Sequence, residues 1–216
     1  PVAIVMAAAT DPVRLGVIAS LSHPGGNVTG LALDVSPTLY GKQVQILREA
    51  VPRLGRPGVL FNPDLPGVQE MLEAVRRSAQ GFGVRVVEMP VRVESELEPA
   101  IQAAVGQHIE ALQVIPDPSN FGFRQRIGEL EAKYRLPSMH FLVEYVAAGG
   151  LMSYGPSLLE QFERCAGFVA RILKGTPPSA LPVELPTRYE LVVNSRTARA
   201  LGITLTKRGK HMGEDI

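Results

Sequence analysis

The sequence predicts an α/β fold in which the strands of parallel sheets alternate with helices. Short apolar runs typical of buried strands alternate along the chain with segments whose apolar residues recur at helical spacing. The clearest unit covers residues 58–89. There, an apolar run at 59–61, a proline-rich turn and an amphipathic segment at 68–80 precede a second apolar run at 84–87. Because a parallel strand pair needs a long crossover, such a unit indicates a parallel sheet.

The residues before this unit predict two strands and two helices. Asp11 and Pro12 stand where a capping residue and a first-turn proline would begin a short helix. A longer helix begins at Ser36–Pro37 and ends before Pro52. In chain order we expect a strand at 2–8, a helix at 13–21, a strand at 28–33 and a helix at 36–51.

The residues after the unit continue the same alternation. The helix expected at 157–174 should bury one stripe of side chains, formed by Leu158, Phe162, Cys165, Val169 and Ile172. Asn194 or Ser195 should cap the last helix. In chain order we expect a helix at 94–105, a strand at 111–115, a helix at 121–134, a strand at 151–155, a helix at 157–174, a strand at 189–193 and a helix at 195–201.

Composition excludes several classes of protein. The chain has 216 residues, of which 45% are hydrophobic and 20% charged, as in globular proteins. A net charge of +1 argues against a nucleic-acid partner, which would need an excess of basic residues. No apolar run is long enough to span a membrane. Cys165 is the only cysteine, so no internal disulfide can form, and we expect it to be a small core residue.

The motifs of common enzyme classes are absent from the sequence. There is no GxSxG nucleophile turn, no phosphate-binding GxxxxGK[ST], no GxGxxG after a strand and no metal-ligand spacing of cysteine and histidine. The four histidines (His23, His108, His140 and His211) are scattered, and we expect them in loops or on the surface. We therefore expect a protein that is not an enzyme and needs neither a metal nor a cofactor.

Small polar residues follow several of the expected strands. Because the carboxyl ends of parallel strands carry the ligand sites of α/β proteins, these residues are candidate ligand contacts. They could equally cap helices and shape turns, and the aromatic residues among the candidates, with Tyr145, could equally belong to the core. The candidates are Thr10, Asp11, Asn62, Asp64, Asp117, Asn120, Phe141, Glu144 and Tyr154.

A series of short blocks covers nearly the whole chain. In order they are AIVMAAATDPV (3–13), LSHPGGNVTG (21–30), LFNP (60–63), VIPDP (114–118), GGLMSYG (149–155), ILKG (172–175), YELVVN (189–194) and TARALG (197–202). These blocks resemble the ABC transporter substrate-binding proteins, in the group that includes the tryptophan-binding lipoproteins.

The resemblance implies a type I periplasmic-binding fold, with two Rossmann-like lobes joined by three crossing segments. Residues 1–35 and 150–184 would form the first lobe, residues 36–149 and 185–205 the second, and residues 206–216 a tail. The implied function is the solute-binding component of an ABC import system. It would capture an amino acid or related small carboxylate between the lobes and deliver it to a membrane permease. The alternative is a small-ligand sensor module of the same fold. The implied location is periplasmic, or lipid-anchored outside the cytoplasm.

The first residues lead to a further expectation. Pro1 opens directly into an apolar run at 2–6, so we expect that an N-terminal portion is missing and that the first lobe is incomplete. Incompleteness would leave the first strand as a sheet edge and uncover apolar surface on the segments at 13–21 and 158–172. We therefore expect a homodimer, or a larger assembly, that buries this surface.

Overall fold

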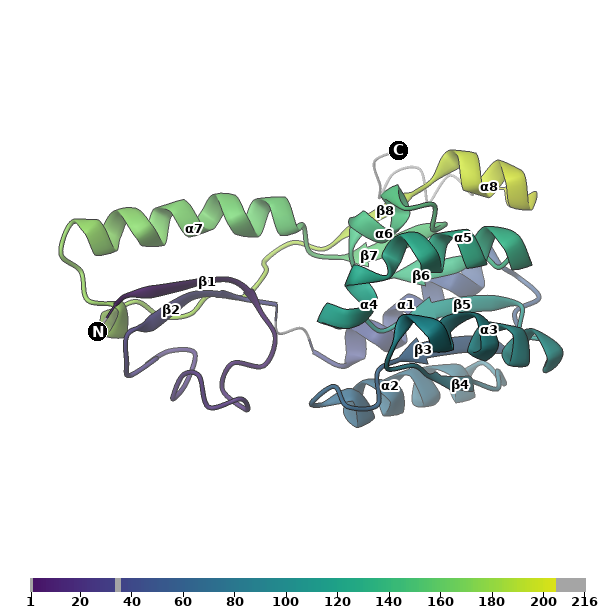
Figure 1. Cartoon of the computed structure of the whole chain (residues 1–216), viewed down its shortest axis with the longest axis horizontal. Coiled ribbons are helices and arrows are strands. Elements are labelled where there is room, and N and C mark those ends of the chain that lie inside the picture. Colours follow the sequence, from purple (N-terminus) through teal and green to yellow (C-terminus); the bar gives the residue numbers. More distant parts are fainter. Residues whose placement is uncertain (1, 34–35, 205–216) are drawn as a thin grey trace. The chain divides into compact units, whose positions relative to one another are not determined.

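The computed structural model describes residues 2–33 and 36–204, and the chain divides into two compact units (Figure 1). One unit comprises Pro1–Ser36 and Pro156–Tyr189, and the other comprises Pro37–Gly155 and Glu190–Ile216. The expected tail at 206–216 lies outside the described residues. We call the two parts unit 1 and unit 2.

Unit 2 is built on a six-stranded sheet. Its strand order is β4-β3-β5-β6-β7-β8, and every neighbouring pair is parallel except β7 and β8. The antiparallel pair aligns Met152 with Val193, and it forms where the chain re-enters unit 2 from unit 1 rather than from a crossover helix. The strands are β3 (Pro57–Phe61), β4 (Val87–Pro90), β5 (Ala111–Val114), β6 (Ser138–His140), β7 (Met152–Gly155) and β8 (Glu190–Val193).

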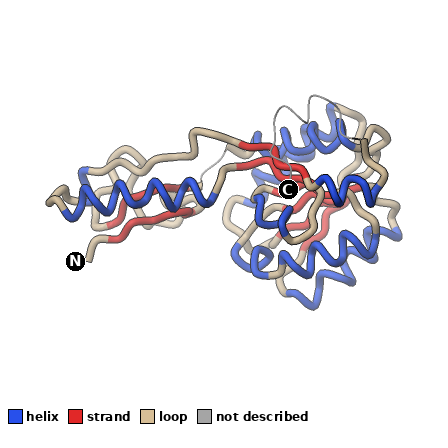
Figure 2. Tube along the Cα trace, turned by 90° about the horizontal axis from the view of Figure 1, so that it is seen from above, coloured by secondary structure: helices blue, strands red, loops and turns tan. Residues whose placement is uncertain are grey.

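Helices cover both faces of this sheet (Figure 2). Because helices shield it on both sides, strands β3 and β5 are buried along their whole length. Helices α1 and α2 pack closely: a methyl group added at Gly41 would lie 3.0 Å from the carbonyl oxygen of Ala74. The helices of unit 2 are α1 (Thr38–Ala50), α2 (Val68–Gly81), the 3-10 helix η1 (Glu94–Glu96), α3 (Leu97–Gly106), α4 (Pro118–Gly122), α5 (Arg124–Tyr134), α6 (Val143–Ala147) and α8 (Ser195–Leu201).

Three sequence expectations for unit 2 differ from the structure. The strand expected at 84–87 begins only at Val87, because the chain turns at Gly83 (φ 68°) after α2. The helix expected at 121–134 is two helices, and the break falls at Phe123, whose backbone leaves the helical region. The boundary expected after residue 149 precedes β7, yet β7 pairs with β6 and β8 and belongs to unit 2.

Unit 1 contains a two-stranded parallel sheet formed by β1 (Ile4–Ala9) and β2 (Val28–Ala32). Helix α7 (Leu158–Leu173) packs on both strands, and the 3-10 helix η2 (Pro178–Ala180) contacts β2. The core between helix and sheet contains Leu31, Phe168 and Leu181. The buried Thr29 hydroxyl donates to the Leu181 carbonyl at 2.6 Å and ties the returning chain to β2.

Two expectations for unit 1 are wrong. Residues 13–21 form successive turns instead of a helix, because Asp11 (φ 47°) and Gly16 (φ 68°) adopt left-handed backbone conformations that a helix does not allow. The predicted buried stripe of α7 is also only partly buried: Phe162 is 60% exposed and Val169 43% exposed. A two-stranded sheet is too narrow to cover the whole stripe, and the helix buries Gln161 and Phe168 instead.

Candidate functional site

The loops that follow β3 and β5 meet at one edge of the unit 2 sheet. The two strands are parallel, with Leu60 aligned to Val114, so their carboxyl ends lie side by side. Asn62 follows β3, and Asp117 follows β5. The Asn62 side-chain amide donates to Asp117 Oδ1 at 3.4 Å, which is a long hydrogen bond. Two residues that are 55 positions apart therefore share one site at the strand ends.

Asp117 is the N-cap of helix α4. Its Oδ1 accepts from the backbone amides of Ser119 (2.8 Å) and Asn120 (3.4 Å), and Asn120 Oδ1 accepts from the Asp117 amide at 3.1 Å. This reciprocal capping box fixes the carboxylate against the helix. The residue is only 6% exposed, and within the described chain its Oδ2 has no hydrogen-bond donor. A buried carboxylate oxygen without a donor is costly, so the site is suited to a group that donates hydrogen bonds.

Tyr145 supports the same loop from helix α6. Its hydroxyl donates to Asn120 Oδ1 at 2.5 Å, while Asn120 Nδ2 donates to the Ile115 carbonyl at 2.7 Å. Burial raises the pKa of Tyr145 well above its ordinary value, and the nearby Asp117 carboxylate raises it further. The hydroxyl therefore keeps its proton and acts as a donor.

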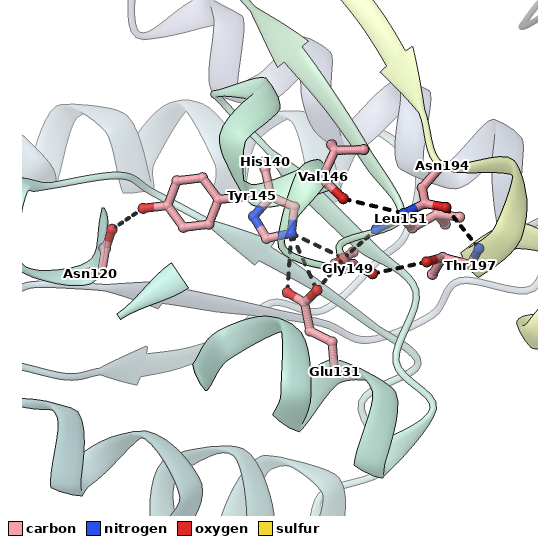
Figure 3. Close-up of polar contacts among 10 residues, drawn as sticks. Asn120, Glu131, His140, Tyr145, Val146, Gly149, Leu151, Asn194 and Thr197 are labelled. Carbon is pink, nitrogen blue, oxygen red and sulfur yellow. Dashed lines mark hydrogen bonds and ion pairs between the residues drawn. The ribbon is translucent and has the colours of Figure 1, made fainter. Parts of the chain in front are cut away.

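A buried polar cluster lies behind the Tyr145 ring (Figure 3). The imidazole of His140 stacks on that ring, with centroids 4.8 Å apart and planes inclined by 11°. His140 Nε2 lies 3.1 Å from Glu131 Oε1 and 3.1 Å from the Ser138 hydroxyl, which donates to Glu131 Oε2 at 2.7 Å. The sequence predicts His140 in a loop or on the surface, but it is the last residue of β6 and only 1% exposed.

The aromatic candidates lie at the ends of β6 and β7. Phe141 is buried, and its ring stacks with Tyr40 at 6.0 Å, so core packing describes its environment in this structure. Tyr154 is half-buried, and its backbone carbonyl accepts from the Gln43 side chain at 2.8 Å. Glu144 is half-buried on α6, and its buried Oε2 has no partner among the described residues.

The remaining candidates are Asp64 in unit 2, whose backbone amide donates to Asn62 Oδ1 at 3.0 Å, and Thr10 and Asp11 in unit 1. Asp64 is exposed and forms an ion pair with Arg92 at 3.0 Å. Thr10 and Asp11 follow β1 in unit 1, where Thr10 is exposed and the Asp11 carboxylate pairs with the Arg14 guanidinium at 2.5 Å. Within unit 2, the structure thus brings together Asn62, Asp117 and Asn120.

Sequence reasoning missed the side chains that support the site. Gln43, Gln113, Glu131 and Ser138 are all buried and hydrogen-bonded to one another, to His140 or to nearby backbone groups. The sequence could have identified Gln113 as a buried, hydrogen-bonded residue, because a glutamine inside the apolar run at 111–115 must find partners within the fold. Across residues 2–33 and 36–204 there is no group of three or more candidate metal ligands, and no helix is long and apolar enough to cross a membrane.

Comparison with known proteins identifies relatives of the whole chain. The ABC transporter substrate binding protein family matches residues 1–210. The tyrosine-binding protein of Clostridioides difficile (strain R20291) is 25% identical over 198 residues, which are 92% of this chain and 56% of the relative. The chain therefore spans little more than half the length of this curated relative.

Solved structures agree with this relationship. A conserved domain protein from Vibrio cholerae O1 biovar El Tor is 27% identical with a TM-score of 0.84, and the match covers 99% of this chain and 71% of that one. The ABC domain of a Streptococcus pneumoniae protein in complex with L-Trp is 23% identical, also with a TM-score of 0.84, over 99% and 73% of the two chains. The fold is that of the type I periplasmic-binding proteins, and this chain corresponds to part of each of these two structures. The chain belongs to the family of ABC transporter substrate-binding proteins.

Proposed function

We propose that this chain is the solute-binding component of an ABC import system and that its ligand is an amino acid with an aromatic side chain. Membership of the family supports the binding role. The relatives named for tyrosine and found with L-Trp support the ligand class. The two units would act as the two lobes that the family resemblance implies, and a membrane permease would receive the ligand.

The proposal depends on one observation in unit 2: among the described residues, Oδ2 of Asp117 has no hydrogen-bond donor. An α-ammonium group offers three hydrogen-bond donors and a positive charge, so it would satisfy this oxygen with a charge-assisted bond. Asn62, whose Oδ1 accepts from the Asp64 amide at 3.0 Å, donates to the other oxygen of Asp117, Oδ1, and so does not occupy Oδ2. Thr10 and Asp11 remain proposed contacts contributed by unit 1.

The test is to replace the carboxylate and measure affinity. With the 216-residue chain, we expect L-tyrosine or L-tryptophan to bind in calorimetry and to raise the melting temperature. The variant Asp117→Asn should lower affinity about tenfold or more, because a charge-assisted bond contributes about 1.5–3 kcal/mol. The matched control is Asp64→Asn, which also removes one carboxylate from a strand-end loop of unit 2 and should leave affinity unchanged.

Ligand analogues separate the ammonium from the rest of the ligand. 3-(4-Hydroxyphenyl)propionate lacks the amino group of tyrosine and should bind weakly to the wild type, with little further loss in Asp117→Asn. Equal binding of tyrosine and this analogue would contradict the assignment of Asp117 to the ammonium. Asp11→Asn tests the unit 1 contact in the same assay, and an unchanged affinity would remove Asp11 from the site.

A transport role also requires that the ligand leaves unchanged. We propose that no residue is catalytic, so mass spectrometry of tyrosine or tryptophan after long incubation should show only the starting compound. A specific product would contradict the transport role. We further propose an extracytoplasmic location, periplasmic or lipid-anchored, which cell fractionation of the native protein would test.

We also propose that the 216-residue chain forms a homodimer through unit 1. Large apolar residues are exposed on its first strand and on helix α7, among them Ile4, Leu159, Phe162, Val169 and Leu173. Within the described chain β1 pairs with β2 alone, so its other edge can accept a strand. An edge strand beside an apolar helix face is complementary to a second copy of itself related by two-fold symmetry.

Light scattering tests the dimer. Phe162→Glu should shift the molecular mass towards that of a monomer at micromolar concentration, whereas Val93→Glu, at an exposed apolar residue of unit 2, should not. A wild type that is monomeric across the micromolar range would overturn this proposal.

A further inference from the structure

The buried polar cluster behind the candidate site is unusual for a protein core. Glu131, Ser138 and His140 are almost fully buried, yet none of them belongs to the strand-end loops. Burying a carboxylate and an imidazole is favourable only when their hydrogen bonds are satisfied, because the low dielectric of the interior makes unpaired polar groups costly. The arrangement therefore needs an explanation beyond packing.

The geometry fixes the proton on the imidazole. His140 Nε2 faces both the Glu131 carboxylate and the Ser138 hydroxyl, whereas Nδ1 is buried and has no partner among the described residues. A proton on Nε2 satisfies the Glu131 contact, so we assign this nitrogen as the donor from the hydrogen-bond geometry.

This anchored imidazole determines where the Tyr145 ring lies. The ring stacks on His140 across one face and meets the edge of Phe121 at 5.9 Å, with planes inclined by 76°. The hydroxyl therefore points at Asn120 Oδ1. The same oxygen also accepts a hydrogen bond from the backbone amide of Asp117. Figure 3 shows this series of contacts, from Glu131 through His140 and Tyr145 to Asn120.

We propose that Tyr145 is a positioning residue for the Asp117 carboxylate: its hydroxyl fixes the Asn120 side chain, and Asn120 fixes Asp117 through the capping box. Tyr145 does not touch the ligand in this scheme, and Glu131 and His140 act one step further back. The proposal rests on the proposed function to the extent that Asp117 holds the ligand. The geometric part concerns the loop alone and can be tested without a ligand.

The variant Tyr145→Phe removes one oxygen atom and retains the stacking. Asn120 Oδ1 still accepts from the Asp117 amide, so the variant should fold. The matched control is Tyr134→Phe on helix α5, whose hydroxyl has no hydrogen-bond partner within the described chain.

Hydrogen exchange tests the geometry. In Tyr145→Phe we expect the amides of Asp117, Ser119 and Asn120 to exchange about fivefold faster, since the lost hydrogen bond contributes about 1 kcal/mol to closing the loop. The amides of β3 and β5 should keep their rates, and Tyr134→Phe should change none of these. Unchanged exchange at 117–120, or equal acceleration throughout unit 2, would overturn the proposal.

A double-mutant cycle tests the consequence for binding. Tyr145→Phe should weaken L-tyrosine binding about fivefold to tenfold in the wild type but have no effect in the Asp117→Asn background, because it acts through that carboxylate. Additive losses would mean that Tyr145 acts by another route and would overturn the positioning role. If the wild type binds neither tyrosine nor tryptophan, the proposed function fails, and the exchange result still decides the geometry.

Discussion

The side chain of Gln43 on helix α1 donates to the backbone carbonyl of Tyr154 at the end of β7, at 2.8 Å. The same Nε2 lies 3.3 Å from the His140 carbonyl at the end of β6, and Gln43 Oε1 accepts from Gln113 on β5 at 2.9 Å. One fully buried glutamine therefore joins a helix to three strands of the unit 2 sheet.

Replacing Gln43 with leucine should destabilise the protein. The variant keeps the approximate volume but leaves the amide of Gln113 and two carbonyl groups with fewer partners, so we expect a loss of about 2–3 kcal/mol in the free energy of unfolding. Urea denaturation measures this loss. Gln102→Leu, on the exposed side of helix α3, is the control and should change stability by less than about 0.5 kcal/mol. Equal effects of the two substitutions would show that the buried network adds no stability.

The two buried tyrosines should make unit 2 sensitive to alkali. Burial raises the pKa of Tyr40 and of Tyr145 above the ordinary value of 10.0. The unfolded chain therefore loses these protons at lower pH than the folded chain. Their contribution to stability is complete below pH 10 and falls progressively above it, at about 1.4 kcal/mol per pH unit for each tyrosine.

Denaturant titrations between pH 9 and pH 11 measure this effect. The variant Tyr40→Phe should reduce the slope of stability against pH above pH 10, because one group is removed from the linkage. Tyr134→Phe should leave the slope unchanged. A slope that is the same in all three proteins would contradict the role of buried phenols.

Two glycines in helices should respond to alanine in opposite directions. A methyl group at Gly128 on α5 would lie 2.2 Å from the Ala148 carbonyl oxygen, so Gly128→Ala should destabilise the protein by about 1–3 kcal/mol. Gly167 on α7 is exposed, with no atom within 4 Å of such a methyl group. There, Gly167→Ala should stabilise the helix by about 0.5–1 kcal/mol, because alanine loses less backbone entropy. Thermal unfolding of both variants would show whether the signs differ.

The sequence was most informative where strands end. Asn62 and Asp117 could be placed at one edge because parallel strands bring their carboxyl ends together, and that inference needs only the alternation of elements. The same inference did not identify Glu131 and His140, because a glutamate in a helix and a histidine after an apolar run usually face solvent. Periodicity identified the apolar face of α7 but not how much of it a neighbour would cover, so the exposure of Phe162 was missed.

The antiparallel pairing of β7 and β8 has a practical consequence for protein engineering. Gly155 and Glu190 are aligned partners, so the point where the chain leaves unit 2 and the point where it returns are adjacent across a single strand pair. The whole segment 156–189 is thus an insertion between the two arms of a hairpin. Because residues 1–36 pack on this segment, they would be removed with it, and an Asn-Gly turn could then join the two arms, since a two-residue type I′ turn suits such a pair. The shortened version would offer a minimal scaffold on which the unit 2 part of the candidate site, around Asp117, could be studied in isolation.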